Sequence, residues 1–563
     1  MSSPNFFQSA PYLQNQFTSD PWLQQLLRWR LPHGLWPSVA QDLERFGKRV
    51  SGEMLDWAWQ AEQEKPELIK YDAWGKRVDE IKLSAAWGRM AQVAAEEGIV
   101  AIGYERAQDE YSRLFQLSKL YLYHPSSAVF SCPLAMTDGA ARIIEVLGSP
   151  ALKDRAFKSL ISRDPKQFWT SGQWMTERSG GSDVSETSTV AKVSGNHFQL
   201  YGTKWFTSAI TSEMALALAR IEGAGSGSRG LSLFYTELRK SDGSLNNIEV
   251  LRLKDKLGTR ALPTAELELH GSQAVLLGEP GHGVRNIATM LNVTRLYNAV
   301  CSVAQMRRGL ALWQDYAAKR VVFGQRLNQQ PLFLETFADH LSRQVACMML
   351  TFSTAELLGK DECGVATNGE KSLVRLLTPL AKLFTGKNAV WTLSEVIEGF
   401  GGAGYIEDTR LPVMLRDAQV FPIWEGPTNV LSLDLLRVLN NGEVWPAFDK
   451  EIRSCLSGKI EPTLEPFAEV AKERLKGLEQ FFAMMVSANP ESWQAVARDL
   501  AFAMSELFAG AKMLEWSGWA EKNAPIAFQK ALQEVARRWW HRPMTVVRPR
   551  SNEDLASVQT TLI

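Results

Sequence analysis

The sequence has 563 residues, of which 45% are hydrophobic, so it is long enough for a large core and too long for one ordinary domain. Its 62 basic residues balance its 62 acidic residues, which excludes a global electrostatic attraction to DNA, RNA or an anionic membrane and leaves only local patches for such partners. The five cysteines are scattered and form no C-x-x-C pair, which argues against a disulfide framework or a metal site and favours a reducing compartment.

Targeting signals are absent from the sequence pattern. No apolar run approaches the ~18 residues of a membrane span. The N-terminal region has no Lys or Arg before Arg28, unlike a secretory signal or an Arg-rich transit peptide, and the last three residues are not a peroxisomal signal. We therefore expect a cytoplasmic protein, with a mitochondrial location left open.

The period of the hydrophobic pattern changes along the chain and predicts a mainly α protein with one β domain. Val50, Met54 and Trp57 recur at helical spacing, whereas after Phe168 short β-branched and aromatic runs alternate with turns. Asn440-Asn441-Gly442 breaks the later helical pattern. The expected segments are an extended N-terminal arm (1–34), an N-terminal helical domain (35–168), a middle antiparallel β domain (169–282), a helical bundle (283–440) and an additional C-terminal helical domain (441–563).

The segment from Gln173 to Asp183 reads Gln-Trp-Met-Thr-Glu-Arg-Ser-Gly-Gly-Ser-Asp and opens the β domain. Its small residues let a ligand approach the backbone, whose exposed N–H groups can bind an anion or the edge of a flavin ring. Thr176 and Ser182 add hydroxyl donors. Taken alone, the segment fits a surface loop better than a ligand site.

A second segment, Gly202-Thr-Lys-Trp-Phe-Thr-Ser208, has the composition of a strand. Trp205 and Thr207 are two residues apart, so a regular strand places both side chains on one face, where they can stack on a flat ring and bind its edge. The alternative is a core tryptophan beside a threonine with an internal hydrogen bond, and alone this alternative is favoured.

Two matches to G-x-G-x-x-G lack the context of a dinucleotide-binding fingerprint, which needs a strand, a glycine turn and then a helix. Gly225–Gly230 lies between two predicted strands and reads as a hairpin loop. Gly399–Gly404 follows a predicted helix, although it still lets a backbone approach phosphates.

Glu425 stands in Ile423-Trp-Glu-Gly-Pro-Thr428, within an apolar run that starts at Val420. Apolar surroundings increase the proton affinity of a carboxylate, which suits a general base near neutral pH. Most glutamates are solvated surface charges, so this interpretation depends on the other segments.

Together, and in this order, these segments resemble the acyl-CoA dehydrogenase family over residues 35–440. The jointly specific motifs are Thr-Glu-x-x-x-Gly-Ser-Asp, Lys-Trp-x-Thr, Arg-x-x-Phe-Gly at Arg320–Gly324, Phe-Gly-Gly-x-Gly-Tyr and Glu-Gly. The C-terminal extension, with Trp-Met-Thr-Glu and Trp-Glu-Gly, resembles the AidB-like (alkylation-response) branch. The resemblance implies a helical domain, a β domain and a helical domain in that order, FAD as cofactor and a homotetramer.

The resemblance also implies roles for individual residues. Glu425 matches the catalytic base, and Ser182 and Arg295 match positions near the acyl-CoA. The residues that match FAD-binding positions are Met175, Thr176, Gly181 and Ser182 in the loop lining the flavin, Trp205 and Thr207 on the strand against it, Arg320 and Phe323 toward the FAD of a neighbouring subunit, and Glu398, Gly401 and Gly402 on the diphosphate side.

The implied reaction is the dehydrogenation of a medium- or long-chain fatty acyl-CoA. Glu425 removes the α-proton of the thioester while hydrogen bonds to the carbonyl oxygen stabilise the developing enolate. The β-hydrogen leaves as hydride to flavin N5, and the flavin supplies the redox chemistry. An electron-transfer flavoprotein and oxygen both fit as the electron acceptor.

Four positions depart from the usual family wording. Glu398 stands for Gln and puts a carboxylate beside the diphosphate, and Pro427 stands for Thr and removes a hydroxyl and an N–H donor. Trp424 replaces Tyr and Asn429 replaces Gln. The base itself is kept.

Two other functions stay open. The AidB-like resemblance suggests a DNA-associated flavoprotein, because Arg537–Arg542, with Arg548 and Arg550, interleaves cations and aromatic rings as nucleic-acid-binding surfaces do. The region from residue 441 onward has 15 Lys/Arg and 16 Asp/Glu, so it is not basic as a whole and we rank DNA binding below catalysis. The third function is sequestration of an acyl-CoA with low turnover.

Overall fold

The computed structural model describes residues 8–550 together with residues 554 and 557. The chain forms two compact units. The first contains residues 52–107 and 115–297, and the second contains residues 1–51, 108–114 and 298–563. Among the described residues, no helix is both long enough and apolar enough to cross a membrane.

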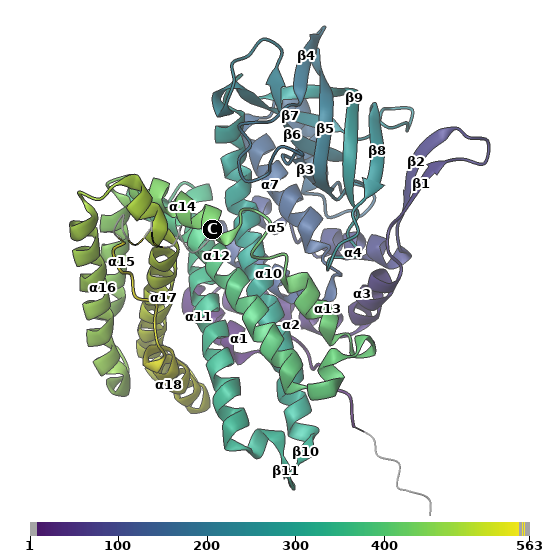
Figure 1. The fold of residues 1–563 in the computed structure, drawn as a ribbon. Helices are drawn as coiled ribbons and strands as arrows, with labels where there is room; N and C mark the ends of the chain where they lie inside the picture. Colours follow the sequence, from purple (N-terminus) through teal and green to yellow (C-terminus); the bar gives the residue numbers. More distant parts are fainter. Residues whose placement is uncertain (1–7, 551–553, 555–556, 558–563) are drawn as a thin grey trace, which may run out of the picture. The chain divides into compact units, whose positions relative to one another are not determined.

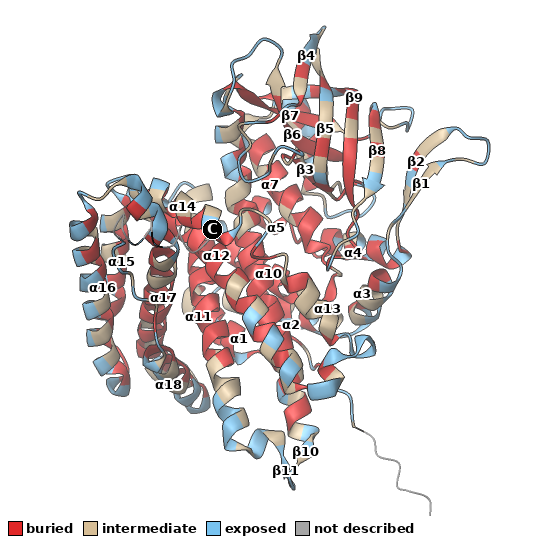
Figure 2. Ribbon diagram, in the orientation of Figure 1, coloured by how far each residue is buried: buried red, intermediate tan, exposed pale blue. Residues whose placement is uncertain are grey.

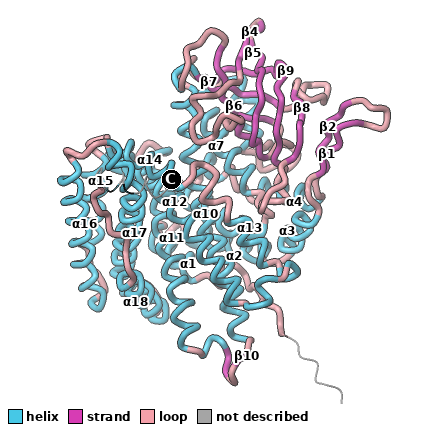
Figure 3. The backbone as a smooth tube through the Cα atoms, in the orientation of Figure 1, coloured by secondary structure: helices cyan, strands magenta, loops and turns pink. Residues whose placement is uncertain are grey.

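The first unit holds the predicted β domain (Figure 3). Its strands are β3 (Ser171–Trp174), β4 (Val190–Ser194), β5 (His197–Ser208), β6 (Met214–Ile221), β7 (Leu231–Glu237), β8 (Ile248–Leu253) and β9 (Thr264–Leu277). They pair in the order β6-β4-β5-β9-β7, and β7 pairs back with β6, so the sheet closes into a barrel. Most pairings are antiparallel as predicted, but β3 and β4 each pair with β6 in parallel. Trp174, Leu200 and Phe234 belong to the buried core of the barrel.

Helices precede the barrel in the same unit, in agreement with the predicted helical domain. They are α3 (Glu53–Gln63), α4 (Ala85–Glu96), α5 (Ile102–Glu105), α6 (Ser112–Tyr123), whose residues from Phe115 belong to this unit, α7 (Ser131–Leu147), α8 (Pro150–Leu152) and α9 (Lys158–Leu160). An antiparallel hairpin of β1 (Glu67–Tyr71) and β2 (Arg77–Lys82) interrupts them, which the helical prediction for this region missed.

The N-terminal arm is not extended throughout, so that expectation was wrong for α1 (Pro21–Arg30). Asp20 caps this helix by accepting hydrogen bonds from the N–H groups of Trp22 and Leu23, each at 3.1 Å. Leu23, Leu26 and Leu27 are buried, so an apolar stripe at helical spacing stabilises the helix.

The second unit is a helical bundle with a helical extension. Its elements are α2 (Trp36–Val50), α10 (Gly283–Lys319), whose residues from Asn298 belong to this unit, the short hairpin β10 (Val321–Val322) and β11 (Gln325–Arg326), α11 (Pro331–Glu362), α12 (Asn368–Gly399), α13 (Leu411–Ala418), α14 (Thr428–Leu439), α15 (Val444–Ser457), α16 (Glu465–Met485), α17 (Pro490–Asn523) and α18 (Ile526–His541). Helix α12 packs against α11, α14, α15 and α17 (Figure 1). It is therefore buried along most of its length (Figure 2).

Candidate functional site

The loop after β3 and the strand β5 lie side by side in the barrel unit. The backbone N–H of Trp205 donates to the carbonyl oxygen of Thr176 at 3.0 Å. Met175 is buried, whereas Gly181 and Ser182 are exposed. A Cβ atom on Gly181 would lie 3.0 Å from the Thr176 side chain, so the loop folds tightly over that threonine. Two of the predicted flavin-lining segments are thus neighbours in space.

A buried ion pair holds these two segments together. The Lys204 ammonium lies 2.7 Å from a Glu177 carboxylate oxygen, and the two side chains are 0% and 2% exposed. Glu177 also accepts hydrogen bonds from the backbone and hydroxyl of Ser188 and from the Thr189 hydroxyl. Burial alone would raise the pKa of Glu177, but Lys204 and these donors lower it to about 2.

Trp205 and Thr207 were expected to share one face of a regular strand, but β5 is irregular at this point. The pairing of β5 with β9 is irregular between Lys204 and Thr207, so a bulge shifts the alternation of side chains. Thr207 is fully buried and its hydroxyl donates to the Ala265 carbonyl oxygen at 2.7 Å. Trp205 is half-buried.

The bulge exposes two residues that the sequence reasoning missed. Phe206 is exposed and Ser208 is half-buried, with its hydroxyl 3.2 Å from the Thr264 hydroxyl. The Ser208 hydroxyl is thus more accessible to a ligand on this strand than the Thr207 hydroxyl. A bulge has no clear signal in a single sequence, so composition alone was unable to reveal this register.

The ring of Trp205 is already covered by cations. The Lys254 ammonium lies 3.4 Å from the ring centroid and the Arg178 guanidinium 5.1 Å from it. Lys254 also pairs with Glu266 at 2.6 Å. Trp205 therefore anchors a cationic patch beside the loop of Thr176.

The bundle unit carries the residues expected near the rest of the cofactor. Phe323 lies in the β10–β11 hairpin, is 99% exposed and has a φ of 50°, and Gly324 follows with a φ of 80°. Arg320, at the end of α10, is half-buried and its carbonyl oxygen accepts the Leu327 N–H at 2.9 Å. The hairpin thus presents an aromatic ring that no part of the described chain covers.

The glycine-rich turn follows α12. Gly401 and Gly402 are exposed, and a Cβ atom on either would meet no other atom within 4 Å. Gly401 has a φ of 61°, which favours glycine. The ring of Phe400 stacks on that of Tyr316 of α10, with 4.4 Å between the ring centroids. This contact attaches the start of the turn to α10. Glu398 is exposed at the end of α12, and burial and the nearby Glu398 carboxylate raise the pKa of Glu395.

Glu425 lies in the turn between α13 and α14. It is half-buried and has a φ of 57°, and Gly426 follows with a φ of 105°. A non-glycine residue in this left-handed region is uncommon and stores strain, as functional residues often do. The Lys382 ammonium donates to the Gly426 carbonyl oxygen at 2.6 Å.

Each unit holds some of the residues that the sequence predicts for the site. Met175, Thr176, Gly181, Ser182, Trp205, Thr207 and the half-buried Arg295 belong to the barrel unit, and Arg320, Phe323, Glu398, Gly401, Gly402 and Glu425 belong to the bundle unit. Their chemistry fits FAD. Open backbone at Gly401 and Gly402 suits a diphosphate, and the exposed Ser182 and Phe206 suit a flat polar-edged ring.

Part of the Arg-Trp cluster predicted at the C-terminal end is packed inside the fold. Trp539 and Trp540 are buried. Arg538 pairs with Glu335 at 2.7 Å and with Glu534 at 2.6 Å. Arg542 lies 3.5 Å from the Trp539 ring centroid and pairs with Glu506 at 3.0 Å, and burial lowers its pKa to about 10. These side chains therefore support packing of the C-terminal domain, whereas Arg537, Arg548 and Arg550 of the predicted cluster are exposed.

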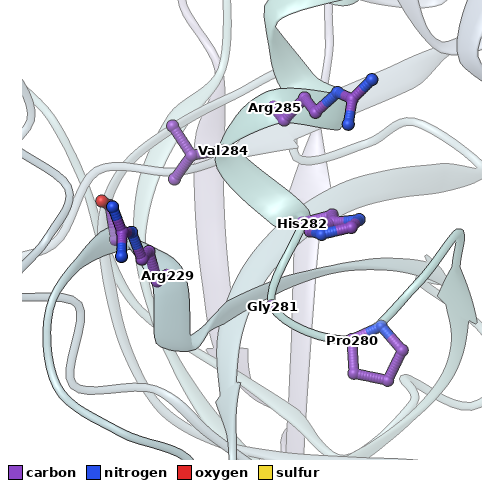
Figure 4. A pocket seen from close by; sticks show the side chains of 7 residues that line it. Arg229, Pro280, Gly281, His282, Val284 and Arg285 are labelled. Atoms are coloured by element: carbon purple, nitrogen blue, oxygen red, sulfur yellow. The ribbon is translucent and has the colours of Figure 1, made fainter.

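A cavity of about 430 Å³ lies where α10 begins. It is lined by Ser228, Arg229, Pro280, Gly281, His282, Val284 and Arg285. Figure 4 shows the Arg229 and Arg285 side chains apart from one another. The pocket contains none of the predicted site residues, so it is separate from the candidate site.

Comparison with known families covers almost the whole chain. Residues 8–165 match the adaptive response protein AidB N-terminal domain, and residues 172–272 match the acyl-CoA dehydrogenase middle domain. Residues 281–439 match the acyl-CoA dehydrogenase C-terminal domain, and residues 443–562 match the acyl-CoA dehydrogenase 11 C-terminal domain-like family.

Whole-chain relatives agree with these matches. The acyl-CoA dehydrogenase family member 11 of Caenorhabditis elegans is 43% identical over 563 residues, which covers 96% of this chain and 90% of the relative. This chain belongs to the acyl-CoA dehydrogenase family. Family members are FAD-dependent oxidoreductases that act on a CH–CH bond. The putative acyl-CoA dehydrogenase AidB of Escherichia coli is 32% identical over 83% of each chain.

The fold of this acyl-CoA dehydrogenase family member also matches a solved structure. The crystal structure of the Caenorhabditis elegans protein in complex with C11-CoA has a TM-score of 0.96 and 41% identity, over 100% of this chain and 97% of that chain. The predicted order of a helical domain, a β domain, a helical bundle and an extra C-terminal helical domain is therefore confirmed.

Proposed function

We propose that this protein oxidises a medium- or long-chain fatty acyl-CoA between Cα and Cβ, with Glu425 as the base that removes the α-proton. The main support for this proposal is the backbone conformation of Glu425, which lies in the left-handed region on a turn between two helices. The relative solved with C11-CoA supports an acyl-CoA of medium length as the ligand.

The chain's own residues have distinct tasks in this reaction. The Glu425 carboxylate takes the proton as the α C–H bond breaks, and hydrogen bonds to the thioester oxygen stabilise the enolate. Bound FAD would supply the redox chemistry, as the acceptor for the β-hydride. Ser182 and Ser208 would hold its ring by hydrogen bonds, Gly401 and Gly402 would give its diphosphate access to the backbone, and Arg295 would guide the thioester.

We extend the proposal to a homo-oligomer in which Phe323 covers part of the FAD of a neighbouring subunit. A fully exposed aromatic ring on a strained hairpin is unusual for a surface that stays in water. A tetramer that accepts Phe323 at such a contact removes this ring from solvent.

An anaerobic titration of the FAD-bound protein with saturated acyl-CoAs of increasing chain length tests the proposed function. We expect the flavin absorbance to bleach with one class of chain length. Glu425→Gln should retain acyl-CoA binding and reduce flavin about 10²–10⁴-fold more slowly, because the amide cannot accept the α-proton. A variant that reduces flavin at the wild-type rate would remove Glu425 from the role of base.

The alternatives give other results in the same experiment. A spectral shift without bleaching indicates an acyl-CoA-sequestering protein. If no acyl-CoA perturbs the spectrum, salt-dependent binding of duplex DNA becomes the next test of the AidB-like function. The internal pairing of Arg538 and Arg542 weighs against that function.

A further inference from the structure

The turn that carries Glu425 is attached to α10 and α12 by three different contacts. The first comes from Lys382 on α12, whose side chain is fully buried. Its ammonium donates to the carbonyl oxygen of Gly426, the residue directly after Glu425, at 2.6 Å. Removing an ammonium from water is costly, so its hydrogen bonds must be well made. This contact fixes the orientation of the peptide that follows Glu425.

The second contact comes from Asn298 on α10, which uses both ends of its amide. Its Nδ2 donates to the carbonyl oxygen of Phe421 at 3.0 Å. Its Oδ1 accepts from the indole Nε1 of Trp424 at 2.5 Å. Asn298 is buried, so these two bonds are protected from water. A single side chain therefore links the start of the turn to the residue before Glu425.

The third contact is a close approach of the backbone at Gly386, one helical turn after Lys382. A Cβ atom on Gly386 would lie 3.1 Å from the carbonyl carbon of Phe421 and 3.2 Å from the nitrogen of Pro422. Those separations are tighter than an ordinary van der Waals contact. Residues four apart share a helix face, so Lys382 and Gly386 support the same turn from the same side of α12.

We propose that Lys382, Asn298 and Gly386 are positioning residues that hold the Glu425 backbone in its left-handed conformation before a substrate binds. This inference rests on the proposed role of Glu425 as the base. None of the three residues takes the proton. They act through the placement of the carboxylate, for which a displacement of about 1 Å can lower a rate about 10²-fold.

The test separates proton removal from hydride loss and from binding. In 3-thiadecanoyl-CoA a sulfur replaces the β-carbon, so the α-proton can leave while no β-hydride exists. Incubation with the FAD-bound protein in deuterium oxide, followed by mass spectrometry of the thioester, measures how fast the α-hydrogens exchange. Calorimetry measures the Kd of the same compound, and decanoyl-CoA measures the rate of flavin reduction.

Three variants test the three contacts. Lys382→Met removes the ammonium, Asn298→Ala removes both amide bonds, and Gly386→Ala adds the methyl group that presses on Phe421. The last variant covers the case in which a buried polar substitution fails to fold, because alanine favours the helix more than glycine does. The matched control is Lys512→Met on α17, which removes a buried ammonium bonded to Glu451 and Glu515 and not to the turn.

We expect the three variants to lose about tenfold or more of both the exchange rate and the flavin-reduction rate while their Kd stays within about threefold of wild type. The Lys512→Met control should keep the wild-type rates even if it melts at a lower temperature. Folded variants with wild-type rates overturn the positioning role alone. A wild-type protein that binds both thioesters and neither exchanges nor reduces overturns the proposed function, and the positioning role with it.

Discussion

Thr207 and Ser208 are adjacent in the sequence, yet Thr207 is fully buried and Ser208 is half-buried. Thr207→Val should lower the free energy of unfolding by about 1–3 kcal/mol, because the Ala265 carbonyl loses its donor inside the barrel. Its FAD affinity should stay close to wild type. Ser208→Ala should weaken FAD binding about tenfold with little change in stability, if one hydrogen bond is lost.

Urea unfolding and a fluorescence titration with FAD measure the two effects separately. Thr207→Ser serves as the control, because it keeps the donor to Ala265. If Thr207→Val has normal stability and no longer binds FAD, Thr207 contacts the flavin. That result would contradict the bulged register of β5.

The buried ion pair between Lys204 of β5 and Glu177 makes the stability of the barrel unit depend on pH. The pKa of Glu177 is lowered to about 2 in the folded protein. Its contribution to the free energy of unfolding is therefore complete above about pH 4.5 and is lost as the pH falls from there toward 2. Glu177→Gln leaves the Lys204 ammonium buried without a carboxylate and should cost about 3–5 kcal/mol at pH 7. The difference between wild type and variant should shrink below about pH 4.5.

Urea unfolding at a series of pH values measures this difference. Glu222→Gln is a suitable control, because Glu222 forms an exposed pair with Lys192 at 3.3 Å. Parallel pH profiles for wild type and Glu177→Gln would show that Glu177 does not contribute in this way.

At the scale of elements, two sides of α12 make different contacts. Lys382 and Gly386 contact the turn of Glu425. Phe384 lies two residues from each of them, and its ring centroid is 5.8 Å from that of Phe502 on α17 and 6.2 Å from that of Trp539 on α18. Residues two apart lie on different sides of a helix. The C-terminal domain thus buries the back of the helix that supports the turn.

Phe384→Ala should therefore destabilise the protein by about 3–5 kcal/mol and weaken the attachment of α17 and α18. Differential scanning calorimetry should show a separate, earlier transition for the C-terminal domain. Phe482→Ala is the control, since Phe482 packs on Trp445 and Trp493 within that domain. A Phe384→Ala protein that unfolds in one transition at the wild-type temperature would show that the two parts do not depend on this contact.

The hydrophobic period predicted most elements, because each has a local signal. The strands β4, β6 and β7 lie where short apolar runs alternate with turns. Helix α1 also had a signal, an Asp20 cap before Leu23, Leu26 and Leu27, and it was missed because aromatic and Gln residues around it obscured the stripe. The hairpin of β1 and β2 was missed because it is short and lies among helices.

The candidate site was only partly predictable. Glu425 and the glycine turn were predicted as site residues because their motifs are contiguous in the sequence. Lys382 and Asn298 were not, since the partners they bind are 44 and 123 residues away in the chain. The bulge in β5 was not predicted, because it depends on the pairing of this strand with β9.

At the scale of the whole molecule, the exposed Phe323 ring leads us to expect that copies of this chain form an oligomer. Phe323→Ser should lower FAD affinity and favour smaller species, because the ring that we propose to cover a neighbouring FAD is lost. Analytical ultracentrifugation with and without FAD measures both effects. Ile526→Ser is the control, because Ile526 is also an exposed apolar residue but lies at the start of α18. Equal FAD affinity and equal mass for Phe323→Ser and wild type would contradict this role.

The complete burial of Lys382 and Lys204 has a chemical consequence for a protein that holds thioesters. Acyl-CoAs acylate free lysine amines without any catalyst, and the reaction needs an amine that is accessible and has lost its proton. Both side chains are 0% exposed, and their ammonium groups donate to Gly426 and Glu177. The two lysines that organise the candidate site are therefore protected from the reactive compounds that the site is proposed to bind.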